Sequence, residues 1–336
     1  MAIARPAAAG ADSPVAWRML AALAGAELLG MSLWFSATAV TPSLAQAFAL
    51  SPSESAWLTM AVQAGFVAAT LLTALANLAD LVNPRTLMGV GCLLGAAANA
   101  SALIVGSPWA LIATRLATGA ALGWVYPPAM KVAAGWFRLR RGYALGMLVG
   151  ALTLGKAMPH LVTALFGAEW RTPILFTSAL AVAGAAVALW IVGDGPLLPA
   201  PSRFDARAVR RVFAVREVRL ATAGYLGHMW ELYAMWAWVA AFAAASLAAA
   251  GSSAPGRDAA LVAFVAIGSG AAGCSWPAAW PTASARRAWR DWRWPPRARA
   301  AWRPPRSTAG IRRGCSRLWR CGASPSSPIR RSSRRW

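Results

Sequence analysis

The chain has 336 residues, of which 58% are hydrophobic, and its mean hydropathy is +0.48. These values exceed those of ordinary water-soluble domains and exclude a soluble globular protein. The net charge of +22 resembles that of a nucleic-acid-binding protein, but residues 274–336 contain 16 of the 33 basic residues and only one acidic residue. Most of the excess charge therefore lies in this C-terminal tail.

Apolar segments of about 20 residues, the length that crosses ~30 Å of hydrocarbon, recur along the first 273 residues. Gly and Ala are abundant in them, as expected where helices pack closely in lipid. The first segment is longer than the core of a secretory signal and contains Glu27, so it is predicted to span the membrane. The predicted spans are 19–41, 56–79, 86–106, 109–131, 142–166, 172–193 and 219–249, followed by an eighth helix that starts near Ala259 and stops around Gly273.

Basic residues in the connecting segments predict the orientation, because Lys and Arg accumulate on the cytoplasmic side of a membrane. Only Arg171 and Arg257 fall in loops on the opposite side. The N-terminus is therefore predicted to be cytoplasmic, in a multi-pass protein of the cell inner (plasma) membrane. The loops on the cytoplasmic side contain Arg5, Arg18, Arg85, Arg138, Arg140, Arg141, Arg203, Arg207, Arg210, Arg211, Arg216 and Arg219.

The loop between the second and third spans, ANLADLVNPR, resembles the signature G-x-L-A-D-R-x-G-R-R of the major facilitator superfamily. Leu78, Ala79 and Asp80 match the signature, and Arg85 falls on one of its terminal basic positions. Both glycines and the first arginine of the signature are replaced, so the family's cytoplasmic latch is matched only in part. Asp80 and Arg85 are the candidate residues of this loop motif.

Two further matches support the resemblance, which covers residues 19–273. Arg115 and Gly119 have the family's R-x-x-x-G spacing in the fourth span, and EWR at Glu169–Arg171 resembles its outer turn before helix six. The resemblance implies an all-α polytopic bundle, with about seven to eight of the expected twelve transmembrane helices present. The implied organisation is a six-helix half at 1–193, a basic cytoplasmic loop at 194–218, the start of a second half at 219–273, and a tail at 274–336.

An internal repeat supports the two-half organisation. ELLGMSLW begins at Glu27 and ELYAMWAW begins at Glu231, so Glu, Leu, Met and Trp recur at identical spacing. The halves of the family are parallel duplicates, which makes helix one the counterpart of helix seven. We favour duplication over chance similarity between two apolar helices.

The duplication predicts a second L-A-D loop near residue 284, where the chain reads WPTAS. A shifted reading frame combines the last base of each codon with the first two bases of the following codon. In that frame the first two bases of each Trp codon complete a codon for Leu, Met or Val, and the first two bases of a Pro codon after Trp complete a codon for Ala. CSWPAAWPTASARRAW then permits LLAGGLADRLGAARV, a better copy of the signature. We interpret the residues after about Gly273 as a frameshift product. The alternatives are a tail that binds an anionic membrane surface or nucleic acid, and an ordinary cytoplasmic tail.

Ionisable residues within the spans are functional candidates, because a charge there costs about 2.5 to 3.5 kcal/mol on insertion scales. His228 and Glu231 share a helix face with Met235, which indicates a bundle interior, and Lys156 and His160 are four residues apart on another helix. Lys131 is expected to extend to the membrane interface. The candidates for a substrate or proton pathway are Glu27, Arg115, Lys156, His160, His228 and Glu231.

Each candidate has a functional and a structural interpretation. Glu27 and Glu231 are candidate proton carriers, since buried carboxyl groups are suited to proton exchange. Arg115 and Lys156 are candidate contacts for an anion, although Arg115 could equally pair with a carboxylate to hold helices together. The two histidines are either part of the pathway or hydrogen-bonded packing residues.

The sequence therefore predicts a proton-coupled secondary transporter that moves a small polar or anionic solute by alternating access. As printed, the chain is expected to be an inactive fragment. Symport is favoured, while antiport and uniport are left open. The alternative is a non-transporting membrane scaffold or receptor with a basic tail that binds lipid or nucleic acid.

Few other partners are expected. The four cysteines have no paired spacing, so neither a disulfide framework nor a zinc site is predicted. No catalytic constellation is evident, and no enzyme activity, cofactor or metal is expected. The expected partners are the lipid bilayer, the solute and protons, without nucleic acid.

Sequencing the gene across the codons for Gly273 and Cys274 tests the frameshift. We expect a one- or two-base change, or an uninterrupted alternate frame that encodes an LADR-like loop and further apolar segments. Stop codons within a few tens of bases in that frame would reject the interpretation, and the tail would then be a genuine segment whose lipid and nucleic-acid binding should be measured.

Overall fold

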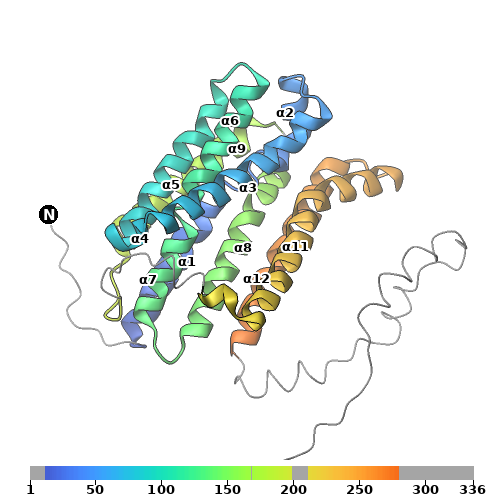
Figure 1. Cartoon of the computed structure of the whole chain (residues 1–336). Coiled ribbons are helices and arrows are strands. Elements are labelled where there is room, and N and C mark those ends of the chain that lie inside the picture. The colour runs from blue at the N-terminus through green and yellow to red at the C-terminus, as the bar shows by residue number, and fades with distance from the viewer. Residues whose placement is uncertain (1–11, 168, 199–210, 280–336) are drawn as a thin grey trace, which may run out of the picture. The chain divides into compact units, whose positions relative to one another are not determined.

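The computed structural model describes residues 12–167, 169–198 and 211–279, and every regular element among them is a helix (Figure 1). The expected all-α fold class is confirmed. Among the described residues, six helices are long and apolar enough to cross a membrane, by length and composition. They are α3 (Pro52–Leu75), α5 (Pro84–Ala100, with a 3₁₀ turn to Leu103), α8 (Arg141–Phe166), α9 (Arg171–Ala186, with a π turn to Ile191), α11 (Arg216–Ala249) and α12 (Pro255–Ala279).

The predicted span 109–131 is divided into α6 (Pro108–Leu122) and α7 (Tyr126–Trp136). Pro127 and Pro128 have no amide hydrogen, so they cannot donate the helical hydrogen bonds that would bridge the junction. The three residues before Tyr126 instead form tight turns, with amide nitrogens 3.0 to 3.1 Å from carbonyl oxygens three residues back. This span is consequently a broken helix.

The predicted span 19–41 is also interrupted, because α1 (Pro14–Met31) ends within it. The hydroxyls of Ser32 and Ser36 donate to carbonyl oxygens three residues back, at 2.6 and 2.9 Å. Side-chain bonds of this kind compete with the helical ladder and favour a turn. The next elements are a 3₁₀ turn (Thr38–Val40) and the short helix α2 (Thr41–Ala47).

Four helices begin with a polar residue followed by proline. The polar side chain accepts a hydrogen bond from a backbone amide of the first turn, while proline occupies a position whose amide needs no helical partner. Local sequence therefore determines where these helices start. The pairs are Ser13–Pro14 for α1, Ser51–Pro52 for α3, Asn83–Pro84 for α5 and Ser107–Pro108 for α6.

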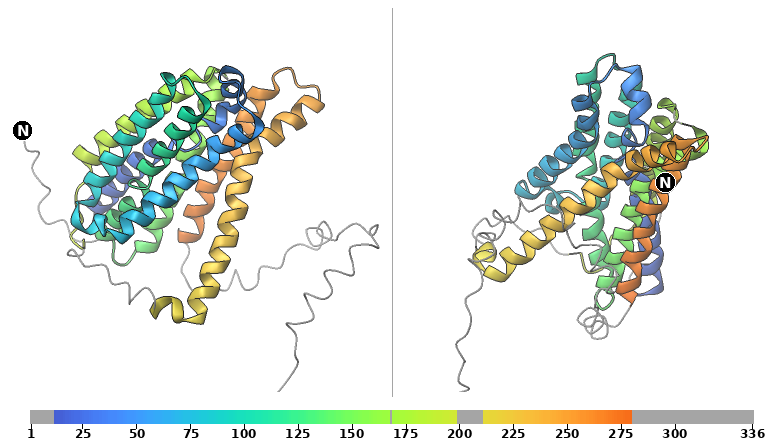
Figure 2. Two further views of the ribbon diagram at one scale, coloured as in Figure 1. Left: turned by 45° about the horizontal axis from the view of Figure 1, so that its top comes forward. Right: turned by 90° about the vertical axis from the view of Figure 1, so that its right-hand side faces the viewer.

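The helices pack pairwise around a largely apolar core. α3 packs on α6, α5 packs on α9, and α1 contacts both α8 and α9. α12 lies along α8 and also contacts α11, as Figure 2 shows. Leu20, Leu23, Met31 and Trp34 are fully or almost fully buried, which places α1 and the turn after it at the centre of this core.

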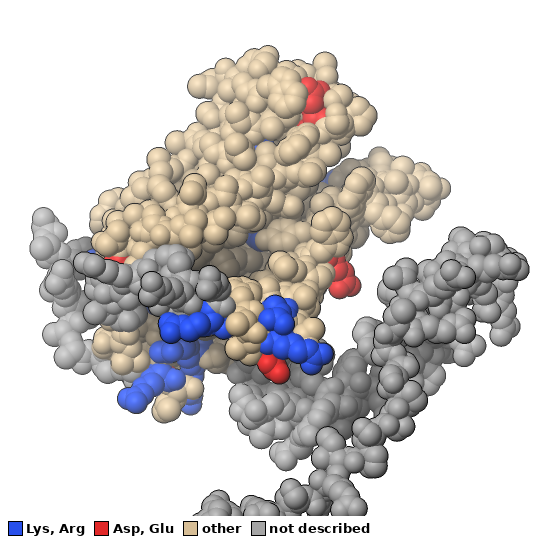
Figure 3. Space-filling view, in the orientation of Figure 1, with Lys and Arg blue, Asp and Glu red and all other residues tan. Residues whose placement is uncertain are grey.

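Lys and Arg side chains gather at one end of the described helices, over the lower ends of α7, α8 and α11 in Figure 3. We call this the basic end; it includes Arg138, Arg140 and Arg216. The carboxylate of Asp12 accepts bonds from the amides of residues 138–140 at 3.0 to 3.2 Å. These bonds, above all the one from Leu139, lower the pKa of Asp12 below its usual range.

The eighth helix differs from its predicted limits. α12 runs from Pro255 to Ala279, whereas the sequence predicted a helix that starts near Ala259 and stops around Gly273. Ala271 and Ala272 favour a helix up to Gly273, and the helix continues to Ala279 although Gly273 and Pro277 have low helix propensity. The remainder of the tail, residues 280–336, lies outside the described residues, and the division into two halves stays a prediction.

The contact between α3 and α6 yields a stability prediction. A Cβ atom added at Gly119 would lie 2.8 Å from the Cα of Val62, closer than atoms pack. We expect Gly119→Ala to destabilise the protein by about 1 to 3 kcal/mol, measured by thermal unfolding in detergent. Gly224→Ala is the matched control, because nothing lies within 4 Å of its added methyl group. Equal melting temperatures for the two variants would contradict this close contact.

Candidate functional site

Lys156 of α8 lies in a cage of three aromatic rings. Its Nζ is 3.8 Å from the ring centroid of Trp34, 4.7 Å from that of Tyr233 and 4.8 Å from that of Trp236. It also donates a hydrogen bond of 2.9 Å to the Tyr233 hydroxyl. Cation–π contacts and this bond partly replace the water that the buried ammonium group has lost. We call the three rings the aromatic cage.

Three parts of the chain build the cage. Trp34 lies in the turn that follows α1, Lys156 comes from the middle of α8, and Tyr233 and Trp236 are one turn apart on α11. Lys156 is only 2% exposed. The cage therefore joins helices that the sequence assigns to the first half to a helix assigned to the second.

Glu27 of α1 is fully buried and interacts electrostatically with Lys156. Neither of its carboxyl oxygens has a hydrogen-bond partner among the described residues. A buried polar group without a partner is costly, more so when it is charged. Glu27 is therefore a candidate for binding a proton or a ligand group.

His160 lies one turn beyond Lys156 on α8 and is 1% exposed. Neither ring nitrogen has a partner in the described part of the chain, and the same is true of the Trp34 indole nitrogen. The His160 ring is 6.3 Å from that of Phe35, which is 6.2 Å from that of Trp236. The aromatic cage therefore contains one unused hydrogen-bonding group, the Trp34 indole nitrogen, and His160 supplies others one helical turn from Lys156.

Arg115 of α6 donates hydrogen bonds to the turn that interrupts the first predicted span. Its Nη2 donates to the carbonyl oxygens of Leu33 and Trp34 at 2.9 and 3.2 Å, and its Nη1 donates to the side-chain oxygen of Asn99. Only its Nε lacks a partner among the described atoms. The sequence left open an ion pair or a substrate contact, whereas the structure shows bonds to the backbone of a turn.

Asn99 connects this turn to α9. Its amide nitrogen donates to the carbonyl oxygen of Ile174 at 3.1 Å and to the Ser178 hydroxyl at 2.9 Å, while Ser36 donates to its amide oxygen at 2.7 Å. Our selection from the sequence missed Asn99 because it considered only ionisable groups. A buried amide in an apolar span was the available signal.

His228 and Glu231 lie on an exposed part of α11, and Met235 is 40% exposed. None of the three residues lies in the core formed by the described residues, and their place in a bundle interior stays a prediction. Because each helical residue turns by about 100°, Glu231 lies about 200° around the helix from Tyr233. The face of α11 that reaches the core is the one with Tyr233 and Trp236.

At the basic end, the loop motif joins separate helices. Asp80, in the short helix α4 (Leu78–Leu81), forms an ion pair with Lys131 of α7. Lys131 was expected to extend to the membrane interface; that stays a prediction, and the ion pair with Asp80 is an additional contact that the sequence did not indicate. A carboxylate within reach gives the ammonium group a partner inside the protein.

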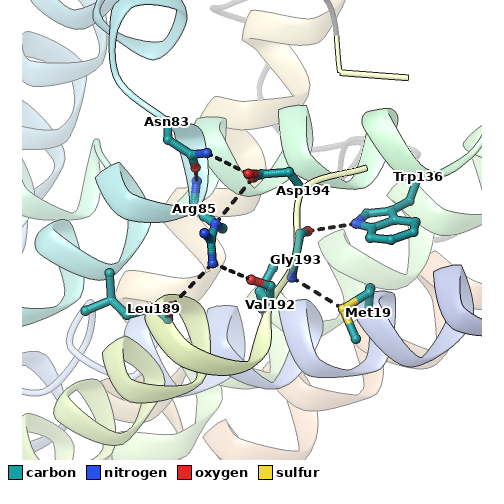
Figure 4. Close-up of polar contacts among 8 residues, drawn as sticks. All are labelled: Met19, Asn83, Arg85, Trp136, Leu189, Val192, Gly193 and Asp194. Carbon is teal, nitrogen blue, oxygen red and sulfur yellow. Dashed lines mark hydrogen bonds and ion pairs between the residues drawn. The ribbon is translucent and has the colours of Figure 1, made fainter. Parts of the chain in front are cut away.

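Arg85, the second candidate residue of the loop motif, contacts the end of the sixth predicted span (Figure 4). Arg85 Nε lies 3.4 Å from a carboxylate oxygen of Asp194, and its Nη1 donates to the Val192 carbonyl at 3.0 Å. Asn83, which replaces a signature glycine, donates to Asp194 at 2.8 Å and accepts from the Arg85 amide at 3.0 Å. The altered loop thus still connects neighbouring helices.

Trp136 and Met19 extend this set of contacts across the basic end. The Trp136 indole nitrogen donates to the Gly193 carbonyl at 2.9 Å, and the Gly193 amide donates to the Met19 sulfur at 3.3 Å (Figure 4). The segment after α9 is therefore held from α1, α5 and α7 together.

These features define a multi-pass helical membrane protein with a charged site buried between helices. A sequence profile described as Major Facilitator Superfamily matches residues 22–256. The match covers more than half of the chain, which therefore belongs to this family of secondary transporters, whose members are generally not enzymes. A search of curated proteins found no match. Within the described ranges, no group of three or more His, Cys, Asp or Glu side chains could hold a metal ion.

Replacement of Arg115 tests its structural role. Arg115→Met leaves the carbonyls of Leu33 and Trp34 without this donor, so we expect a loss of about 2 to 4 kcal/mol in unfolding free energy. Thermal unfolding in detergent measures the change. Arg171→Met is the matched control, because the Arg171 side chain is 63% exposed, and its effect should stay within about 0.5 kcal/mol. Equal stability of both variants would favour the anion-contact interpretation of Arg115.

Proposed function

We propose that the protein carries a small polar or anionic solute across the cell inner (plasma) membrane together with protons. Alternating access of two halves exposes the solute first to one side and then to the other. The basic residues of the described loops support a cytoplasmic location for the basic end and for the N-terminus. Membership of the family supports secondary transport, and the buried site supports the finer features.

The burial of Glu27 within electrostatic range of Lys156 carries the proposal. When Glu27 is ionised, its charge offsets that of Lys156, and an anion gains little from entering the site. Protonation of Glu27 leaves the positive charge of Lys156 uncompensated in surroundings of low dielectric, where it attracts an anion strongly. Proton and anion therefore favour each other's binding, which is the thermodynamic requirement for symport.

The aromatic cage couples this change in charge to the contact between the two predicted halves. Lys156 belongs to the first half, whereas its hydrogen-bond acceptor Tyr233 and the ring of Trp236 belong to α11. An anion that binds Lys156 competes with these contacts and changes how firmly α11 is held. His160, one turn away, is proposed as a further hydrogen-bonding group of the pathway.

The remaining sequence candidates have narrower roles in this proposal. Arg115 supports the turn rather than the solute, because both of its terminal nitrogens are engaged. Glu231 as a second proton carrier rests on the repeat alone. A scaffold or receptor remains the second candidate function, but it does not account for the unpaired carboxyl group of Glu27.

We also propose that residues after about Gly273 are read out of frame and that the printed chain is inactive. Transport is therefore assayed with both the printed chain and a gene in which the alternate frame is restored. Uptake by the printed chain alone would reject the fragment proposal without affecting the proposed chemistry.

Glu27→Gln tests the proton coupling. Proteoliposomes that contain a pH-sensitive dye are given a panel of small organic anions, and the anion that carries protons inward is then used in labelled form. Because glutamine cannot release a proton, the variant should lose accumulation driven by a pH gradient while it retains exchange of labelled for unlabelled solute.

Glu169→Gln is the matched control, because the Glu169 side chain is 53% exposed. It should accumulate solute as the unaltered protein does. Accumulation by Glu27→Gln at the unaltered rate would remove Glu27 from the coupling mechanism. Absence of uptake and proton flux with every solute, in the frame-restored protein, would favour the scaffold.

A further inference from the structure

The aromatic cage limits what the site can bind. An organic cation that entered it would have to displace the Lys156 ammonium group from three ring faces. The displaced charge would then remain buried without these contacts, at a high cost in free energy. The fixed cation of the chain therefore favours an anion as the ligand.

The number of available charges limits the ligand further. Lys156 is the only basic residue in the cage, and Arg115 is engaged with the turn after α1. With Glu27 protonated, the local charge is that of Lys156 alone. One positive charge in low dielectric matches one negative charge, and a dianion would bring an uncompensated charge into the site.

Hydrogen-bonding capacity points to a group with two acceptor atoms. Lys156 has three N–H donors and gives one to Tyr233, whose own hydroxyl proton is left to donate. The indole N–H of Trp34 and both nitrogens of His160 have no partner among the described residues. A carboxylate accepts several such bonds at once.

The aromatic side chains of the cage suit a ligand that contains a planar ring. The rings of Trp34, Tyr233 and Trp236 surround the ammonium group, and the ring of Phe35 lies beside Trp236. Planar unsaturated groups stack on such rings or meet them edge to face. We propose that the site binds aromatic monocarboxylates, with the carboxylate on Lys156 and Tyr233 and the ring against the edges of the cage side chains, whose faces Lys156 occupies; this inference rests on the proposed transport function.

Equilibrium binding of radiolabelled benzoate to the purified 336-residue chain in detergent tests the inference, since every residue invoked belongs to it. Benzoate should bind saturably. Cyclohexanecarboxylate, which retains the charge and approximate size but has no flat ring, should bind about two- to tenfold more weakly. Benzyltrimethylammonium, an aromatic cation, should not compete with benzoate.

Substitutions locate the binding site. Lys156→Met should weaken benzoate binding about ten- to hundredfold, whereas Lys156→Arg, which retains a cation, should bind more tightly than Lys156→Met. Trp34→Leu should weaken binding about two- to tenfold. The matched controls are Arg18→Met and Trp190→Leu, whose side chains are exposed outside the cage, and both should bind as the unaltered chain does.

Three results would overturn the inference: no saturable benzoate binding, equal affinity for cyclohexanecarboxylate, or unchanged affinity in Lys156→Met. Competition by benzyltrimethylammonium would assign the cage to cations instead. The proposed function is judged separately by proton flux. Flux with a non-aromatic anion and no benzoate binding would reject only this inference, whereas benzoate binding through Lys156 without flux for any solute would reject only transport.

Discussion

The Arg115 guanidinium group, bonded to the backbone of a broken helix, is the interaction on which the rest of the site depends. Within a membrane every backbone polar group needs a partner inside the protein. The turn after α1 leaves carbonyls without helical donors, and Arg115 donates to those of Leu33 and Trp34. Asn99 ties the same guanidinium to α9. The turn, and with it the ring of Trp34, is thereby fixed opposite Lys156.

The structure separates firmly held contacts from groups that can respond to a ligand. The close approach of α3 and α6, the Arg115 bonds and the ion pairs of the basic end involve groups that already have partners. Glu27 and His160 have no hydrogen-bond partner in the described part of the chain, and Lys156 contacts α11 through a single hydrogen bond and ring faces. Proton and solute binding are therefore expected to act where α1, α8 and α11 meet.

Features set by local sequence were predictable, and features set by distant contacts were not. Segment length and apolar character identified the six long helices but not the breaks in the spans 19–41 and 109–131, and the loop motif with its topology identified the family. The break after α1 combines local bonds of Ser32 and Ser36 with bonds from Arg115, a donor more than sixty residues away, so hydropathy could not show it. Glu27, Lys156 and His160, which were selected as ionisable residues within the spans, are buried, as suits charged residues that avoid lipid.

The face of α11 that contacts the described core was not predicted, because a uniformly apolar helix does not reveal which face is buried. The sequence favoured the face with His228 and Glu231, whereas the aromatic face with Tyr233 and Trp236 contacts the core. Attention to ionisable residues alone also overlooked the cage, whose members carry no charge. Large aromatic residues near an intramembrane lysine were the signal that could have found it.

Reactivity of the two lysines tests the central claim, which is that Arg115 holds the turn that encloses Lys156. Lys131 and Lys156 are the only lysines of the chain, so reductive methylation followed by mass spectrometry reports on each separately. In the unaltered protein we expect Lys131, at 21% exposure, to be methylated and Lys156 to resist. In Arg115→Met, Lys156 should become reactive while Lys131 is unchanged. Methylation of Lys156 as readily as Lys131 in the unaltered protein, or continued resistance in Arg115→Met, would contradict the account.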